Sequence, residues 1–249
     1  IMDDTFNDSM EKMDRLERAI ELSKIPNFEF CAYIKPELLA TKKEMIPKLV
    51  GLGLRGAFLG IESLNNKTRK AIARGLDIER VQEACQRLVE EKKNQVLINA
   101  AFIVGLPYES RDDLYKTVEY LISHKDTFAR SWEFRSLILR KDTSSQANIQ
   151  STFDNNPEKY GYSFEPDTFN WQNEHFTNIT AGAFTKELRA LSKNHHRPAG
   201  WSVASCWQIN KSEDYIQNSV LDYEFFGKEM ADYKRIRYQN DLRRFTELG

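Results

Sequence analysis

The sequence of 249 residues predicts an α/β fold built around a parallel β-sheet. Up to about residue 140, short apolar segments alternate with longer segments in which apolar residues recur at helical spacing. Each predicted strand precedes a helix and each predicted helix precedes a strand, which favours parallel strands joined by right-handed crossovers. The segment Val96–Val104 is apolar throughout, as is typical of a parallel strand that is buried on both faces.

The first part of this alternation runs to residue 61. Residues 8–24 are expected to form a helix with one apolar side, and Asp8 is its expected N-cap. The aromatic-rich segment Phe28–Ile34 is a predicted strand. A helix around Met45–Val50 follows and ends at nearby glycines, because glycine readily adopts the left-handed conformation found at helix C-termini. The next predicted strand is Arg55–Ile61.

The second part of the alternation begins with the clearest helical pattern of the chain. This helix, over 78–93, has an apolar stripe formed by Val81, Ala84, Cys85 and Leu88. After the strand Val96–Val104, Ser110 is expected to cap a further helix, whose first turn contains acidic residues that complement the helix dipole. Trp132–Leu139 is the next predicted strand.

The character of the sequence changes after Leu139. Residues 141–164 are polar and rich in turn-forming residues, 181–191 read as a helix, and 201–209 as a strand. Residues 214–248 are expected to be mostly helical. We therefore predict a partial barrel domain over 1–140 and a mostly helical C-terminal extension over 141–249.

Composition narrows the classes of function. The formal net charge of -1 gives no general electrostatic attraction to nucleic acids or anionic lipids, and no apolar run approaches the roughly 20 residues that span a bilayer. The cysteines Cys31, Cys85 and Cys206 are scattered, so neither a disulfide framework nor a local metal site is visible. These observations indicate a reducing, cytoplasmic location.

The beginning of the sequence is unusual because Ile1 precedes the first methionine. We interpret Ile1 and Met2 as the end of a severed strand, so that an N-terminal segment of the fold is missing. The alternative is a vector-derived residue before a true start at Met2. Counting the stump at Ile1, the predicted strands are too few for a complete eight-stranded barrel.

Short polar motifs follow the predicted strands. They are DDTF at residues 3–6, Lys35-Pro36, GIES at residues 60–63, Arg74-Gly75, and GLPYES at residues 105–110. Because ligands of parallel α/β sheets bind at the carboxyl ends of the strands, these motifs are expected to gather around one ligand.

Taken in order, these motifs resemble the radical SAM superfamily, and most closely the branch that often carries an N-terminal cobalamin-binding domain. The resemblance runs from Ile1 to about Leu139. It implies a partial (β/α)6 barrel whose first strand and CxxxCxxC loop, which hold a 4Fe-4S cluster, are missing from this chain. It also implies that S-adenosylmethionine (SAM) binds at the top of the barrel and is cleaved reductively to a 5′-deoxyadenosyl radical. The cluster ligands are not in this chain, and cobalamin rests on the branch resemblance alone.

The resemblance assigns cofactor contacts to individual positions. Asp3, Asp4 and Thr5 match the strand end that faces the SAM amine, and a solvated turn is the alternative. Glu62, with Ser63 beside it, matches the position that binds the ribose, and a surface glutamate is the alternative.

Two basic residues complete the polar assignments. Arg74 matches the residue that binds the SAM carboxylate, because a guanidinium group can bind two oxygens, and a cation favoured by a helix C-terminus is the alternative. Lys35 matches a basic position of the cobalamin branch, or is a solvated lysine.

The resemblance also places the adenine against the long apolar strand. Ile103, Val104 and Gly105 match the strand end whose backbone frames the base, and Gly105 would permit a close approach. Some relatives have an aspartate where this sequence has Ala101, which removes one polar contact. Ordinary core packing is the alternative for these residues. No catalytic side chain and no metal ligand is assigned.

Three functions remain open. The favoured one is the SAM-binding portion of a radical SAM enzyme, acting on an unknown small-molecule or peptide substrate, a lipid-like precursor or a modified nucleotide. This chain alone is then expected to be inactive. The second is a degenerate, non-catalytic barrel that serves as a binding module. The third is a TIM-barrel lyase or aldolase, for which Lys35 is the only candidate catalytic lysine.

Overall fold

The computed structural model of the chain describes residues 5–25, 27–91, 96–139, 153, 156–165, 170–192 and 195. The chain divides into two compact units, residues 1–209 and 210–249, and every described residue belongs to the first. The predicted strand stump at Ile1, the strand over 201–209 and the helices over 214–248 lie outside the described residues. The predicted domain boundary near residue 140 stays a prediction.

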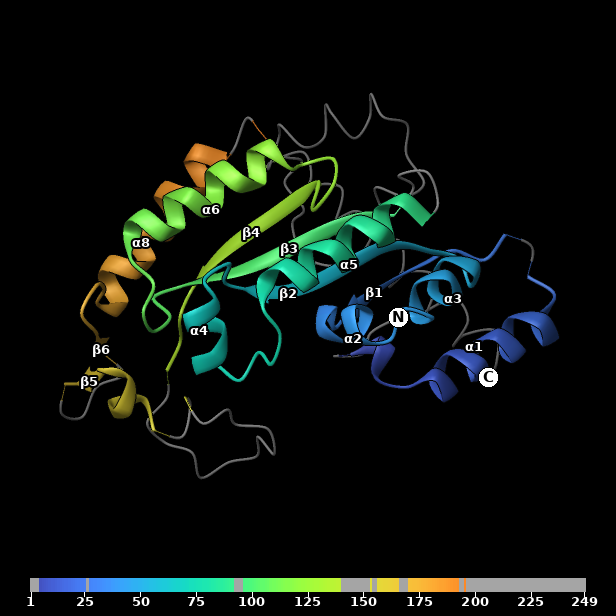
Figure 1. Cartoon of the computed structure of the whole chain (residues 1–249), viewed down its shortest axis with the longest axis horizontal. Helices are drawn as coiled ribbons and strands as arrows, with labels where there is room; N and C mark the ends of the chain where they lie inside the picture. The colour runs from blue at the N-terminus through green and yellow to red at the C-terminus, as the bar shows by residue number, and fades with distance from the viewer. Residues whose placement is uncertain are drawn as a thin grey trace, which may run out of the picture. The chain divides into compact units, whose positions relative to one another are not determined.

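A four-stranded parallel sheet forms the centre of the described structure (Figure 1). Its strands lie in sequence order: β1 (Phe30–Ile34), β2 (Leu54–Glu62), β3 (Leu97–Val104) and β4 (Ser131–Ser136). The expected α/β class with parallel strands is therefore confirmed. All four carboxyl ends meet at one edge of the sheet, because the strands are parallel.

Helices separate the strands along the chain. A second, two-stranded antiparallel sheet follows β4. The remaining elements are η1 (Phe6–Asp8), α1 (Met10–Ser23), α2 (Pro36–Thr41), α3 (Met45–Gly51), α4 (Asn66–Ala71), α5 (Ile78–Glu91), α6 (Arg111–Ser123), η2 (Pro157–Tyr160), β5 (Ser163–Phe164), β6 (Trp171–Gln172) and α8 (Asn178–Ser192).

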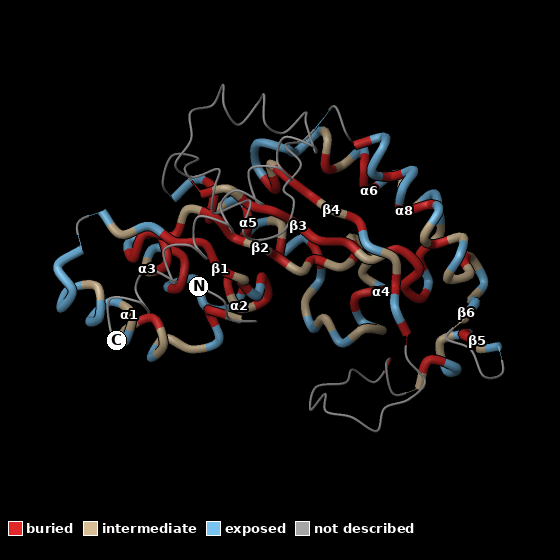
Figure 2. Tube along the Cα trace, turned by 180° about the vertical axis from the view of Figure 1, so that it is seen from behind, coloured by how far each residue is buried: buried red, intermediate tan, exposed pale blue. Residues whose placement is uncertain are grey.

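One face of the sheet forms the hydrophobic core with the helices. Leu59 on β2, Ala100 on β3 and Trp132 on β4 lie side by side in register and are buried with the apolar stripe of α5. Figure 2 shows that most residues of the strands are buried, and Figure 1 shows α5 lying across β2 and β3. The alternate residues of β2, Phe58, Gly60 and Glu62, are only partly buried. Glu62 is therefore outside this core.

Helix boundaries follow capping chemistry, with one correction. Ser9, not the expected Asp8, caps α1, since its hydroxyl accepts a hydrogen bond from the Lys12 amide, while Asp8 forms an ion pair with Lys12. The predicted cap at Ser110 is confirmed, and its side chain forms a reciprocal capping box with Asp113. None of the described helices has the length and apolar character that crossing a membrane requires.

Candidate functional site

The end of β2 places Glu62 at the carboxyl edge of the sheet in an unusual conformation. The β2–β3 register shifts between Gly60 and Glu62, and Glu62 has a φ of 67°. A left-handed conformation is unfavourable for a side chain with a Cβ, and such strain concentrates at functional sites. The bulge turns the carboxylate back along the strand, where it lies over Gly60.

Arg74 reaches the same place from the segment that follows α4. Its Nη2 atom is paired with Oε1 of Glu62, and the two side chains keep exposed fractions of 25% and 16%. Ala73 has a φ of 59°, and the Arg74 amide donates to the Arg69 carbonyl at 2.8 Å, which ends the helical path. The predicted pair of Glu62 and Arg74 is thus brought together, and each now binds the other.

Two further charged residues lie beneath this pair. Glu37, in the first turn of α2, is 3.0 Å from Nη2 of Arg69 through Oε1 and 3.6 Å from Nη1 of Arg74 through Oε2. The Arg69 side chain is fully buried. Glu62 and Glu37 therefore alternate with Arg74 and Arg69, and their formal charges cancel. We call these four residues the charge network.

Burial sets the electrostatics of the charge network. Loss of solvent raises the pKa of Glu62, and the positive charge of Arg74 opposes this rise. Burial likewise lowers the pKa of Arg69, against the favourable charge of Glu37. Each charge is tolerated here because an opposite charge lies beside it, so removal of one partner exposes the cost of burying the other.

Ser63 is buried beside the charge network, and its carbonyl accepts a hydrogen bond from Nη1 of Arg69 at 3.4 Å. Its hydroxyl donates to the carboxyl group of Glu109 and accepts from the Asn65 amide at 2.9 Å. Glu109 is buried, which raises its pKa to about 8, and its Oε2 atom has no hydrogen-bond partner among the described residues. Ser63 therefore joins the GIES and GLPYES motifs, and the proposal that it contacts a cofactor stays a prediction.

The segment after Asp3 and Asp4 lies at the end of β1. The buried Asn7 side chain accepts a hydrogen bond from the Lys35 amide at 2.7 Å and donates to the Lys35 carbonyl at 3.1 Å. This contact places the backbone around Thr5 and around Lys35 at the same edge of the sheet as the charge network. Asp3 and Asp4 lie outside the described residues.

The predicted adenine-framing residues are divided between the two sides of β3. Val104 is buried, whereas Ile103 is half-buried, since successive residues of a strand point to opposite faces. Gly105 has a φ of 101°, and a Cβ there would lie 2.5 Å from Cη2 of Trp171. Its carbonyl accepts hydrogen bonds from the Tyr162 hydroxyl and from Nδ2 of Asn173. The close approach that Gly105 permits is therefore made by Trp171.

Backbone strain is concentrated at this edge. Of the non-glycine residues with positive φ among the described segments, Glu62, Ala73 and Tyr108 lie in the loops that carry the motifs. Lys24 and Asn27 are the others, on either side of the loop between α1 and β1. Strained residues persist where the surroundings hold them, which supports this edge as the candidate site.

The described residues do not fit an iron–sulfur cluster. Cys31 and Cys85 are both buried, and burial raises the pKa of the Cys85 thiol to about 12, so it stays protonated. No group of three or more His, Cys, Asp or Glu side chains within the described segments is arranged to hold a metal ion. Cys206 lies outside these segments.

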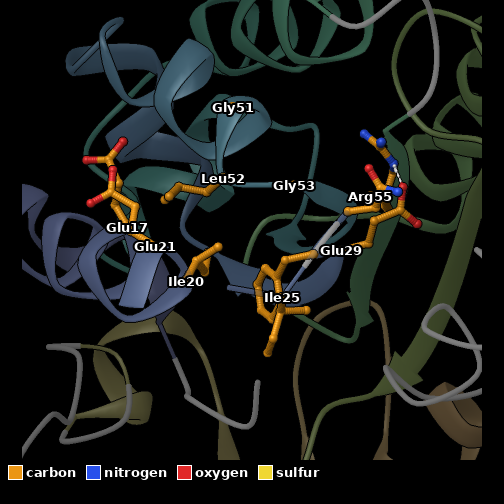
Figure 3. Close-up of a pocket in the computed structure, with 11 residues that line it drawn as sticks. Glu17, Ile20, Glu21, Ile25, Glu29, Gly51, Leu52, Gly53 and Arg55 are labelled. Atoms are coloured by element: carbon orange, nitrogen blue, oxygen red, sulfur yellow. Dashed lines mark hydrogen bonds and ion pairs between the residues drawn. The ribbon is translucent and has the colours of Figure 1, made fainter. Parts of the chain in front are cut away.

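A cavity of about 430 Å³ lies at the other end of the sheet (Figure 3). Its lining includes Phe28 and Glu29, which precede β1, and Arg55 near the start of β2. Arg55 is paired with Glu29 at 2.7 Å. None of the predicted site residues that the structure describes lines this cavity, because those residues follow the strands rather than precede them.

Sequence reasoning missed several residues of this edge. Glu37 directly follows Lys35-Pro36 and Glu109 lies in GLPYES, so both motifs offered a signal that the assignment did not use. Arg69 gives no signal, because a lysine- and arginine-rich segment such as 67–74 reads as a solvated helix.

Comparisons with known proteins bear on the family of the chain. Residues 2–121 match the family model described as the radical SAM superfamily, a range that contains every predicted cofactor position. None of the curated proteins matches the chain.

Two solved structures are similar in fold. The radical S-adenosylmethionine methyltransferase TsrM from Kitasatospora setae, with cobalamin and a [4Fe-4S] cluster bound, is 18% identical with a TM-score of 0.45, covering 55% of this chain and 27% of that one. Coproporphyrinogen III oxidase (HemN) from Escherichia coli, a radical SAM enzyme, is 14% identical with a TM-score of 0.43, covering 63% and 41%. The chain thus spans well under half of either protein.

Proposed function

We propose that this chain is the SAM-binding portion of an enzyme that uses SAM for radical chemistry, because residues 2–121 match the family model of the radical SAM superfamily. The observation that carries the proposal is the pair of Glu62 and Arg74 at the carboxyl edge of the sheet. Both side chains are partly exposed, so a ligand can reach them, and Glu62 is held there by a strained backbone.

The chemistry of the residues fits SAM. The guanidinium fork of Arg74 is suited to the two oxygens of the methionyl carboxylate, and the Glu62 carboxylate is suited to accept hydrogen bonds from the ribose diol. Gly60 leaves room beside both groups, since a Cβ there would lie 2.5 Å from Oε1 of Glu62 and 3.3 Å from Nη2 of Arg74. When bound, SAM supplies a 5′-deoxyadenosyl radical after reductive cleavage.

The cluster that starts this chemistry has no ligand set within the described segments. We therefore expect the chain by itself to bind SAM weakly and to be inactive, with the cluster loop supplied by a part of the enzyme outside these segments. We propose a reducing, cytoplasmic location, which the buried thiols of Cys31 and Cys85 fit. Under this proposal the substrate of the intact enzyme is a small molecule or a peptide.

A second candidate function is a non-catalytic binding module. It is favoured by one observation: each carboxylate of the charge network already forms an ion pair with a guanidinium group. In that case the network would only stabilise the fold. Stoichiometric iron and sulfide bound to this chain after anaerobic reconstitution would contradict both the expected inactivity and this second function.

Calorimetric titration with SAM tests the proposal. Glu62→Ala is expected to weaken SAM binding by tenfold or more, because it removes the acceptor for the ribose. Glu83→Ala is the matched control, since Glu83 is an exposed glutamate of α5 away from the network. Equal affinities for the Glu62 variant and the unmodified chain would remove Glu62 from the site.

A further inference from the structure

Glu37 occupies a central position in the charge network. It lies directly after β1, at the N-terminal turn of the short helix α2, and only 8% of its surface is exposed. One of its oxygens faces Arg69 and the other faces Arg74, at 3.0 Å and 3.6 Å. Glu37 is therefore the residue that connects a fully buried cation to a partly exposed one.

Arg69 gives Glu37 a fixed partner. Its Nη1 atom donates to the Ile61 carbonyl at 2.7 Å and its Nε atom donates to the Leu76 carbonyl at 3.1 Å. A guanidinium group is planar, so these bonds to the end of β2 and to the loop after α4 fix the direction of Nη2, which donates to Glu37 at 3.0 Å. The Glu37 carboxylate is thus held from the buried side.

Arg74 has two different environments at its two terminal nitrogens. Nη1 faces Glu37, which is almost completely buried, whereas Nη2 faces Glu62, which is nearer to solvent. A carboxylate ligand that arrives from solvent can replace Glu62 at Nη2 without disturbing Glu37 at Nη1. The site then keeps one anion on each side of the guanidinium, and Glu62 becomes available to hydroxyl donors.

We propose that Glu37 is a positioning residue, which holds the Arg74 guanidinium so that it can exchange Glu62 for the carboxylate of SAM. The inference rests on the proposed function, because it needs SAM at this edge. Glu37 touches no part of the ligand and acts only through Arg74. Its negative charge is essential to this role, since without it Arg69 and Arg74 would be neighbouring cations with no anion between them.

The test compares two ligands that differ in the group Arg74 is expected to bind. Decarboxylated SAM keeps the nucleoside, the sulfonium and the amine of SAM and lacks only the carboxylate. Dissociation constants for both are measured by equilibrium dialysis on the full chain, for the unmodified protein and for Glu37→Gln. We expect Glu37→Gln to lower the preference for SAM over decarboxylated SAM about tenfold. A preference equal to that of the unmodified protein would overturn the proposal.

A double-variant cycle separates positioning from a general structural effect. In the Arg74→Gln background, Glu37→Gln is expected to change the preference no further, because its effect passes through Arg74. An equal additional loss in that background would also overturn the proposal.

Glu37→Asp keeps the charge but shortens the side chain, so its preference should fall between the unmodified protein and Glu37→Gln. If Glu37→Gln fails to fold, this variant carries the test, and an unchanged preference counts against positioning. If the unmodified chain binds neither nucleoside, the proposed function is wrong and this inference falls with it.

Discussion

The Ser63 hydroxyl donates a hydrogen bond to the buried carboxyl group of Glu109, and this contact joins the end of β2 to the turn that precedes α6. The residues lie 46 positions apart in the sequence. Because burial raises the pKa of Glu109 to about 8, the carboxyl group is mostly protonated at neutral pH in the folded chain. The protonation state of the Glu109 carboxyl in this contact therefore depends on pH.

Glu109→Gln is expected to make stability less dependent on pH. Between about pH 4.5 and pH 8 the folded chain keeps a proton on Glu109 that the unfolded chain has released, so the free energy of unfolding falls as pH rises through this window. Glutamine carries no such proton. Urea unfolding at several pH values measures the change in slope, with the exposed Glu119→Gln as the control. Parallel pH profiles for the unmodified and Glu109→Gln proteins would contradict the assignment of a neutral Glu109.

Arg69→Met is expected to destabilise the fold strongly. The substitution leaves Glu37 without its nearest cation and removes the donors to Ile61 and Leu76, and breaking a buried ion pair costs about 3–5 kcal/mol. Arg18→Met, at an exposed position of α1, should change stability by less than about 0.5 kcal/mol. Chemical denaturation of both variants is the measurement, and similar small losses would show that the network is not buried as described.

Gly60→Ala is expected to separate ligand binding from stability. The new Cβ would press on the ends of the Glu62 and Arg74 side chains, at 2.5 Å and 3.3 Å, and these flexible ends can move aside at a cost below about 1.5 kcal/mol. Their displacement should nevertheless weaken SAM binding severalfold. Gly51→Ala, where a Cβ would meet nothing within 4 Å, is the control and should leave binding unchanged. Full SAM affinity in Gly60→Ala would argue against ligand contacts at this pair.

Gly105→Ala and Gly161→Ala form a matched pair of strained positions. Both glycines have positive φ, 101° and 84°, so alanine is unfavourable at each by about 1–2 kcal/mol. Only Gly105 also has a close neighbour, since its Cβ would lie 2.5 Å from Trp171, and such overpacking adds about 1–3 kcal/mol. Thermal unfolding should therefore rank Gly105→Ala as clearly less stable. Equal losses would mean that Trp171 is not seated against Gly105.

Much of the fold was predictable because it follows from local patterns. The uninterrupted apolar run of β3 and the stripe Val81, Ala84, Cys85 and Leu88 of α5 report burial directly, and both elements occur where expected. The capping box of Ser110 and Asp113 is equally local, since both partners lie within one turn. The cap of α1 was assigned to the wrong residue because Asp8 and Ser9 are adjacent and both are good caps.

The candidate site was predictable only in part. The motifs marked Glu62 and Arg74, but the contact between Glu37 and Arg69 joins residues 32 positions apart and leaves no periodic trace. A charged residue is normally solvated, so a fully buried Arg69 could not be expected from the sequence. The contact between Trp171 and Gly105 could not be predicted for a similar reason, because packing between distant loops depends on the finished tertiary structure.

The left-handed backbone at Glu62 lowers the stability of the fold, while the side chain at this position is the one proposed to recognise the ligand. Glycine there would relax the backbone by about 1–2 kcal/mol, while removing the carboxylate that Arg74 now holds. In the folded chain this gain is opposed by the loss of the ion pair with Arg74, so the strained backbone at Glu62 is held by the same contact that places its carboxylate.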